Sequence, residues 1–127
     1  MAIVGIGTDI VEIQRIQAAL QRTGRGLAQR ILTDQEMVVF DKHHHPERFL
    51  AKRFSAKEAA SKALGTGIAK GVSFHDFTIL NDENGKPTLN MTGKAAVFAE
   101  QFGVTSMHIS ISDEKHYATA MVVLEAL

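Results

Sequence analysis

Two carboxylates and one lysine have the side-chain types that a metal-assisted reaction on a phosphate requires. Glu58 and Lys62 lie four residues apart in the segment FSAKEAASKALGTG (54–67), so on a helix they share one face. Asp9 lies in the alternating segment AIVGIGTDIVEI (2–13), although aspartate is disfavoured within strands. Mg²⁺ binds through one or two carboxylates and completes its octahedron with water and phosphate oxygens. Asp9 and Glu58 would hold such an ion if they meet, and Lys62 would reach the same phosphate.

Simpler explanations also account for segment 54–67. Glu58 and Lys62 could form an ordinary exposed ion pair, or Ser55 could cap the helix with Glu58 as its capping-box partner. The cap is the weaker explanation, because Pro46 predicts a helix that begins two turns earlier. Ser61 shares the face of Glu58 and Lys62, whereas the alanines and Leu64 lie on the other side. Taken by itself, the segment favours the exposed ion pair over a site.

The elements that would position these residues follow from periodicity and from helix caps. A strand is predicted over 3–11, in which Gly5, Gly7 and Asp9 share one face. Ile13, Ile16 and Leu20 then predict a helix that ends at Gly24 and Gly26, and a capping box of Thr33 and Glu36 opens another short helix. The remaining predicted elements are a helix over 46–64 closed by Gly65, short strands at FTIL and PTLNM joined by a hairpin at Asn84-Gly85, a helix over 92–102 capped by Thr92 and stopped at Gly103, and two antiparallel strands at MHISIS and YATAMVVLE. The fold class expected is α+β, a single domain over 1–127 with an antiparallel sheet packed on one long central helix and shorter helices.

Composition limits the classes of function. The chain has 127 residues, 45% of them hydrophobic, which suits one small domain whose limited core would gain from self-association. Its formal net charge is zero, so no nucleic-acid binding or stable membrane association is expected, although all six arginines lie within the first 53 residues. The absence of cysteine excludes disulfides, cysteine-ligated zinc and thiol catalysis. No basic leader and no apolar run of membrane-spanning length occur, so a cytoplasmic protein is expected.

The segment GTGIAKG (65–71) only superficially resembles a phosphate loop. It follows a predicted helix, whose C-terminal end carries partial negative charge and repels phosphate. A phosphate here would have to be held by metal, lysine and loop amides. The alternative is that Gly65 is a simple helix cap, while three glycines in seven residues suggest a close approach by ligand or backbone.

Basic and histidine residues provide further candidates. Arg15 and Arg22 are seven residues apart on the first helix, with Arg25 just beyond, and form either a solvated face or a docking site for an acidic partner. The run His43-His44-His45 suggests a metal site, but adjacent residues do not share a helix face, so an exposed loop before Pro46 is expected instead. His108, which alternates with Ser110 and Ser112, could be a core histidine or a ligand contact.

Four segments together resemble one family. GIGTDIVEI, FSAKEAASKALGTGI, NGKP and HISISDEKHYATAMVVLE, in this order, resemble the holo-acyl-carrier-protein synthases, the small trimeric phosphopantetheinyl transferases of bacterial fatty acid biosynthesis. The resemblance extends over nearly the whole chain. Many members have histidine after the SIS strand, where this chain has Asp113, so any role of that position is not carried over.

The resemblance implies a reaction and its substrates. The 4′-phosphopantetheine arm of coenzyme A is transferred to a serine of apo-acyl carrier protein, with release of adenosine 3′,5′-bisphosphate. Asp9 and Glu58 would bind Mg²⁺, and Lys62 would neutralise the transferred phosphoryl group or relay a proton. A metal-bound water or a carboxylate would take the proton of the serine.

The family also implies roles for residues that spacing alone leaves open. Ser61, Gly65, Thr66 and Gly67 would lie at the pantetheine and phosphates, with Arg53 at a phosphate. Lys86, Pro87 and His108 would lie near the adenosine, with adjacent subunits of a homotrimer contributing to each site. Since acyl carrier protein is acidic, Arg15, Arg22 and Arg25 would dock it in an encounter that weakens as ionic strength rises. Two rivals remain, a non-catalytic Mg²⁺-dependent module that binds coenzyme A or a nucleotide, and a metal-dependent pyrophosphate hydrolase.

Overall fold

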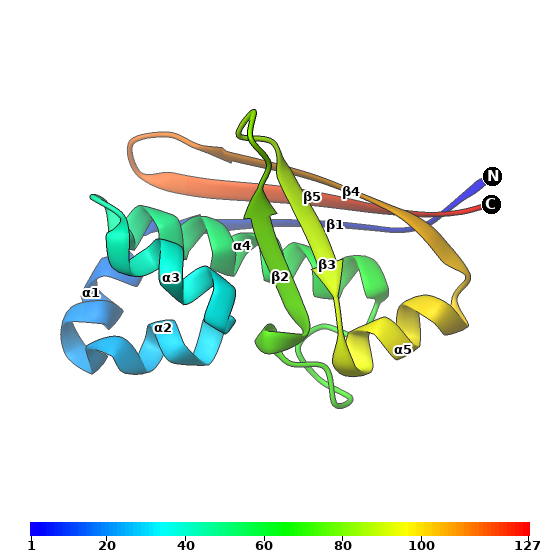
Figure 1. Ribbon diagram of the computed structural model, residues 1–127, viewed down its shortest axis with the longest axis horizontal. Helices are drawn as coiled ribbons and strands as arrows, with labels where there is room; N and C mark the ends of the chain where they lie inside the picture. Colours follow the sequence, from blue (N-terminus) through cyan, green and yellow to red (C-terminus); the bar gives the residue numbers. More distant parts are fainter.

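The computed structural model describes residues 1–127 and contains five α-helices, one short 3₁₀ helix and five strands (Figure 1). The elements, in chain order, are β1 (Ala2–Glu12), α1 (Ile13–Thr23), α2 (Arg25–Ile31), α3 (Asp34–Lys42), α4 (Pro46–Leu64), the 3₁₀ turn η1 (Phe74–Asp76), β2 (Phe77–Asn81), β3 (Pro87–Met91), α5 (Gly93–Gln101), β4 (Val104–Asp113) and β5 (Tyr117–Ala126). None of the helices combines the length and the apolar composition needed to cross a membrane.

The strands form two antiparallel sheets. The larger has the order β1-β5-β4, so that β1 and β4 are its two edges, and β2 pairs with β3 in a separate hairpin. All the helices lie on one side of the larger sheet, and α4 runs along that side (Figure 1). The predicted α+β class, the antiparallel pairing and the long central helix are confirmed, although the strands divide between two sheets.

Helix α4 is the centre of the fold. It begins with Pro46 at its first turn and ends at Gly65, which adopts the left-handed conformation with φ of 82°, as the sequence predicted. The alanine face of α4 is buried with Leu64 against the inner faces of β1 and β5, together with Val122 and Leu124 of β5. Small side chains on this face let the strands approach the helix closely, which sets where the residues of β1 lie.

Glycines on β1 bring its backbone into direct contact with α4. A Cβ atom added to Gly5 would lie 1.8 Å from the carbonyl oxygen of Ala63, and one added to Gly7 would lie 1.8 Å from that of Ala59. Only glycine is compatible with this contact, because no side chain can occupy a carbonyl oxygen's position. Asp9, next on the same face, therefore lies against the turn of α4 that carries Glu58 and Lys62.

A buried ion pair that the sequence analysis did not predict fixes α3 to α4. Lys57 and Glu36 are both fully buried and paired through Nζ and Oε1, and Lys57 also donates a hydrogen bond to the carbonyl of Ile31. The other oxygen of Glu36 accepts the amide of Ile79 on β2 at 2.8 Å. Glu36 also closes the predicted capping box with Thr33. One carboxylate thus joins α3, α4 and β2, which satisfies the requirement that buried charges be paired.

Two local predictions were wrong. Gly26 does not end the first helix, since the chain breaks at Gly24 and then forms α2, which contains Gly26. Thr92 occupies the N-cap position of α5 but makes no capping hydrogen bond, and the Asp76 carboxylate accepts the Ala95 amide instead. At α5, a tertiary neighbour thus supplies the cap that the local signal assigned to Thr92.

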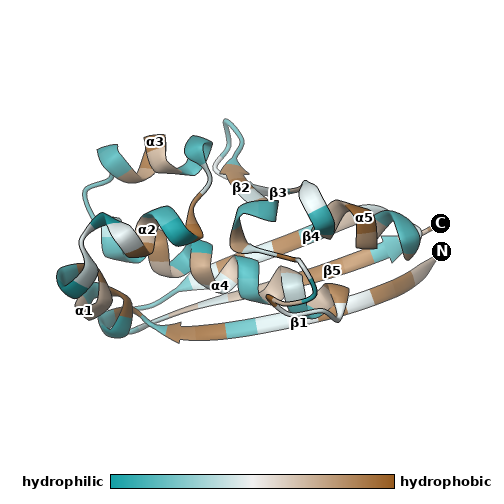
Figure 2. Ribbon diagram, turned by 90° about the horizontal axis from the view of Figure 1, so that it is seen from below, coloured by the Kyte–Doolittle hydropathy of each residue, from teal (hydrophilic) through white to brown (hydrophobic).

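The outer face of the larger sheet carries apolar side chains. Ile6 and Ile10 of β1 are 58% and 64% exposed, and Ile3, Tyr117 and Met121 are also exposed. Figure 2 shows hydrophobic segments on the long strands β1, β4 and β5. Exposed apolar residues grouped on one face are typical of an interaction surface.

The contact of β1 with α4 predicts opposite effects for two glycine-to-alanine substitutions. Gly7→Ala should lower the free energy of unfolding by about 3 kcal/mol, because the added methyl group forces β1 away from the backbone of α4. Gly26→Ala should raise it by about 0.5–1 kcal/mol, because the nearest atom to a Cβ there is 3.9 Å away and alanine is the better helix former.

Denaturant titration of both variants and the unmodified protein measures these differences. Equal stability of Gly7→Ala and the unmodified protein would contradict the close contact.

Candidate active site

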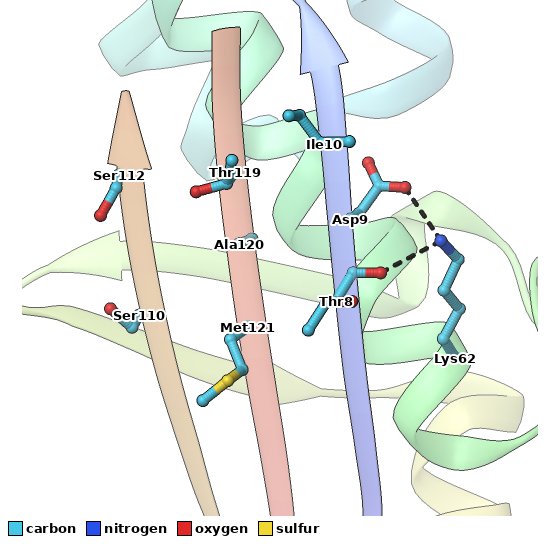
Figure 3. Close-up of a pocket in the computed structure, with 9 residues that line it drawn as sticks. All are labelled: Thr8, Asp9, Ile10, Lys62, Ser110, Ser112, Thr119, Ala120 and Met121. Atoms are coloured by element: carbon cyan, nitrogen blue, oxygen red, sulfur yellow. Dashed lines mark hydrogen bonds and ion pairs between the residues drawn. The ribbon is translucent and has the colours of Figure 1, made fainter. Parts of the chain in front are cut away.

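Lys62 and Asp9 meet at the outer edge of β1. The Lys62 ammonium donates to Asp9 Oδ1 and to the carbonyl of Thr8, both at 3.1 Å. Figure 3 shows the two side chains turned toward each other, beside a cavity of about 460 Å³ that extends across β5 to the hydroxyl groups of Ser110 and Ser112 on β4. The alternative of an exposed Glu58–Lys62 ion pair is thus wrong, because Lys62 pairs with Asp9.

Glu58 lies close enough to Asp9 for their charges to interact. Burial raises the pKa of the Glu58 carboxyl above its ordinary value, the negative charge of Asp9 raises it further, and the Lys62 ammonium opposes both effects. Two carboxylates and one ammonium thus leave an excess of negative charge at this point. Such a site favours a cation or the positive end of a dipole.

The donor set fits the predicted magnesium ion. Asp9 Oδ2 is buried and has no hydrogen-bond partner, so one carboxylate oxygen is free beside the partly buried Glu58. No group of three or more histidine, aspartate or glutamate side chains that could hold a metal occurs in the chain. A metal here would therefore rely on two carboxylates together with water or phosphate oxygens, which is a coordination that Mg²⁺ accepts.

The two serines of α4 form hydrogen bonds within the fold. Ser55 lies inside α4, where its hydroxyl donates to the carbonyl of Asp9 at 3.1 Å, so the Ser55 cap is excluded. Ser61 is fully buried and its hydroxyl donates to the carbonyl of Glu58 at 2.8 Å. A contact of Ser61 with a ligand stays a prediction that its burial does not support.

The amides of the loop at 65–67, which the sequence analysis considered as phosphate ligands, are already hydrogen-bonded within the chain. The amides of Gly65, Thr66 and Gly67 donate to the last free carbonyls of α4, those of Lys62 and Ser61. Gly65 is thus the simple helix cap that the sequence left open. No other part of the chain lies within 4 Å of a Cβ built on Gly65 or Gly67, so their positive φ values, rather than a close backbone approach, require glycine.

Arg53 lines a second cavity, of about 390 Å³, between α4, β4 and the β2–β3 hairpin. Its guanidinium donates to Asn81 Oδ1 at 2.7 Å and lies over the ring of Phe49. Arg53 Nε is buried and has no hydrogen-bond partner, with Glu36 Oε2 3.9 Å away. Burial lowers the pKa of Arg53, and the charge of Glu36 opposes that shift. A fixed guanidinium at a cavity wall is suited to bind phosphate.

The structure brings together Lys86, Pro87 and His108, as the family resemblance implied. They line a third cavity, of about 420 Å³, between β3 and β4. His108 is exposed, with its Nε2 atom 2.8 Å from Glu125 Oε1, so the alternative of a core histidine is wrong. Since Pro87 lines both this cavity and the Arg53 cavity, the two adjoin.

The predicted site residues fall into two groups that one chain holds apart. Asp9 and Lys62 lie at the β1 edge of the sheet, whereas the cavities of Arg53 and Lys86 lie at the β4 edge, beyond β5. Local sequence patterns do not predict this separation, because it depends on strand order.

The predicted basic docking residues are exposed but differ in their pairing. Arg15 and Arg22 lie on α1, and Arg25 begins α2. Arg25 forms an ion pair with Asp41 of α3, so its charge is already compensated. The run His43–His45 lies in the exposed connection between α3 and α4, where His43 packs on Phe49.

Because the pKa of Glu58 is raised, replacing this residue with glutamine should stabilise the fold to an extent that depends on pH. Above its raised pKa the ionised carboxylate destabilises the metal-free folded state. This cost is lost as the pH falls from the raised folded pKa to below the unfolded value of about 4.3, where the carboxyl is mostly protonated in both states. Glu58→Gln should therefore raise the Tm of metal-free protein at pH 7 and leave it nearly unchanged at pH 4.

Calorimetry at both pH values, with Glu100→Gln on the exposed face of α5 as the charge-matched control, measures the difference. A Glu58→Gln variant less stable than the unmodified protein at pH 7 would show that the carboxylate is not destabilised there.

Comparisons with known proteins identify the family of the chain. The family profile described as the 4′-phosphopantetheinyl transferase superfamily matches residues 5–122. The chain is 62% identical, over 99% of its length and 100% of the relative's, to a holo-acyl-carrier-protein synthase of Vibrio vulnificus. Its structure is similar to the crystal structure of the Neisseria meningitidis holo-acyl-carrier-protein synthase, with 42% identity, a TM-score of 0.92 and coverage of 98% and 99% of the two chains. It is also similar to the Bacillus anthracis synthase in complex with coenzyme A (3′,5′-ADP), with 42% identity, a TM-score of 0.82 and 98% coverage of each chain. The chain belongs to the holo-acyl-carrier-protein synthase family of 4′-phosphopantetheinyl transferases.

Proposed function

We propose that this chain, over residues 1–127, transfers the 4′-phosphopantetheine arm of coenzyme A to a serine of apo-acyl carrier protein in fatty acid biosynthesis. The observation that carries the proposal is the group formed by Asp9, Glu58 and Lys62, whose charges and free carboxylate oxygen suit a metal-bound phosphate. Membership of a transferase family, and relatives whose structures contain coenzyme A or its 3′,5′-ADP portion, support the same substrate. In the reaction, the serine oxygen bonds to the phosphorus next to pantetheine. The bridging P–O bond breaks, adenosine 3′,5′-bisphosphate leaves, and the serine proton passes to a base.

Asp9 and Glu58 would hold the metal ion, for which Mg²⁺ is the proposed identity. When bound, a divalent cation would neutralise the negative charge of the pyrophosphate. Asp9 contributes its unpaired Oδ2, while its Oδ1 holds Lys62. The Lys62 ammonium is half exposed and points along the β1 edge, so it is positioned to neutralise an incoming phosphoryl oxygen.

The anionic end of coenzyme A is assigned to the cavities at the β4 edge. Arg53 provides a fixed cation, and Lys86, Pro87 and His108 line the adjoining cavity for the adenosine. Contact of Gly65, Thr66 and Gly67 with pantetheine would use side chain or carbonyl atoms, because their amides are bonded to α4.

One substrate would then bridge two chains. Since the Asp9 group and the Arg53 group lie at opposite edges of the sheet, a complete site requires a neighbouring chain whose β4 edge faces the β1 edge of the first. The apolar outer face of the sheet, with Ile6, Ile10 and Met121 exposed, provides a surface for this association. A closed homotrimer, as the family resemblance implies, satisfies both requirements.

The arginines of the first two helices are the proposed docking site for the acidic carrier protein. Arg15 and Arg22 are free to form new ion pairs, whereas Arg25 must first exchange Asp41 for a carboxylate of the carrier protein. Arg15 and Arg22 are therefore expected to contribute more to docking than Arg25. A cytoplasmic location is part of the same proposal, since the enzyme would act where coenzyme A and carrier protein meet.

Intact-mass spectrometry of apo-acyl carrier protein, incubated with coenzyme A, Mg²⁺ and this protein, tests the function. The carrier protein should gain the mass of one phosphopantetheine, and the gain should disappear with a chelator or with Glu58→Ala, because both remove the metal site.

Two other outcomes would contradict the transferase. Binding of coenzyme A without any mass gain would identify the non-catalytic module. Release of 4′-phosphopantetheine and adenosine 3′,5′-bisphosphate in the absence of carrier protein would identify the hydrolase.

A further inference from the structure

Asp113, at the end of β4, forms ion pairs with two cations of α4. Its Oδ2 atom accepts a hydrogen bond from Arg48 Nη1 at 2.9 Å, and its Oδ1 atom lies 3.6 Å from the Lys52 ammonium. Arg48 and Lys52 are one helical turn apart, so the carboxylate lies between them. All three side chains are about one-third exposed, which leaves them accessible to solvent.

The two ion pairs differ in what else holds the cation. Arg48 also donates to the carbonyl oxygens of Glu114 and Lys115, at 2.9 and 2.8 Å, and so fixes the β4–β5 turn to α4. Lys52 has no second acceptor among the hydrogen bonds of the chain, and its distance from Asp113 is too long for a hydrogen bond. Arg48 is thus anchored independently of the carboxylate charge, whereas Lys52 is restrained only by it.

Lys52 is also part of the wall of the Arg53 cavity. That cavity is lined by the cationic side chains of Lys52 and Arg53 and by His43, and none of its lining residues is acidic. Asp113 lies just outside, two residues after Ile111, which lines the cavity from β4. Two carboxylates pair with cations of this wall, Asp113 with Lys52 and Glu36 with Arg53. Glu36 is fully buried in the core, so Asp113 is the solvent-accessible one of the two.

We propose that Asp113 tunes the affinity of the Arg53 cavity for anionic ligands by holding Lys52. This inference rests on the proposed function, which places the phosphate-bearing end of coenzyme A in that cavity. An incoming phosphate must compete with Asp113 for the Lys52 ammonium, so Asp113 weakens the binding of coenzyme A and of the product adenosine 3′,5′-bisphosphate alike. Asp113 is a positioning residue, because it acts on the ligand through Lys52.

Asp113→Asn removes the charge and retains an oxygen that can accept from Arg48. The variant should bind adenosine 3′,5′-bisphosphate about two- to fivefold more tightly, the range expected when a partly exposed ion pair no longer competes. The KM for coenzyme A should fall in proportion. Binding should also weaken more steeply with salt, because Lys52 then pairs with the ligand instead of Asp113.

Isothermal titration calorimetry at two ionic strengths measures these affinities. Two variants serve as controls. Lys52→Gln combined with Asp113→Asn should lose the gain, because the effect passes through Lys52. Glu100→Gln, which removes an exposed carboxylate on α5, should leave the affinity unchanged, and melting curves of all variants report the fold.

The outcomes separate this inference from the proposed function. Unchanged or weaker binding in folded Asp113→Asn, with normal binding by the unmodified protein, would overturn the role of Asp113 and leave the proposed function standing. A gain that persists in the double variant would also overturn it, since Lys52 would not be involved. Absence of adenosine 3′,5′-bisphosphate binding by the unmodified protein would overturn the cavity assignment in the proposed function and this inference with it.

Discussion

The contact between the backbones of β1 and α4 is the constraint on which the site depends. Gly5 and Gly7 let the strand lie directly on the carbonyl oxygens of the helix, a distance at which no other residue fits. Successive side chains of a strand point to opposite faces, so this contact fixes which face of β1 meets the helix. Asp9 lies on that face, which brings it to Lys62 and within reach of Glu58. The carboxylates that charge repulsion would separate are held together by packing. Burial first, and the nearby charge of Asp9 second, raise the pKa of Glu58, and a bound cation would relieve this cost of ionisation.

The Glu36–Lys57 pair has the corresponding role at the other edge of the sheet. Replacing a buried ion pair with apolar residues often leaves the stability of a fold unchanged or raises it. The main consequence of the Glu36–Lys57 pair is therefore the geometry that it imposes. Glu36 fixes α3, α4 and β2 to one another. Arg53, whose guanidinium lies between Glu36 and Asn81, is thereby held at the cavity wall. Each half of the proposed site is thus anchored to α4, one through close packing and the other through a buried charge.

Local signals in the sequence predicted most of the fold and supplied the candidate residues of the site. Pro46 and Gly65 marked both ends of α4, and the capping box of Thr33 and Glu36 marked the start of α3. The sequence could not show that Glu36 has a second role, because Lys57 lies 21 residues away and resembles any helical lysine. The available signal was the position of Lys57, which lies beside the buried alanine face when the segment is placed on a helix. The hydrogen bonds of the amides at 65–67 were missed for a similar reason, since a loop sequence does not reveal that its donors are already used by the preceding helix.

Strand order, which no local pattern specifies, places the two halves of the site at opposite edges of one sheet. The central claim is therefore that one transfer site combines the Asp9 group of one chain with the Arg53 and Lys86 cavities of another. Mixing subunits tests it most directly, with one chain carrying Asp9→Ala and the other Lys86→Ala with His108→Ala, each impaired alone. After subunit exchange, confirmed by native mass spectrometry, phosphopantetheine transfer should rise above the sum of the two parents, because some sites regain both intact halves. Transfer that only equals that sum, in oligomers shown to be mixed, would contradict a site shared between chains.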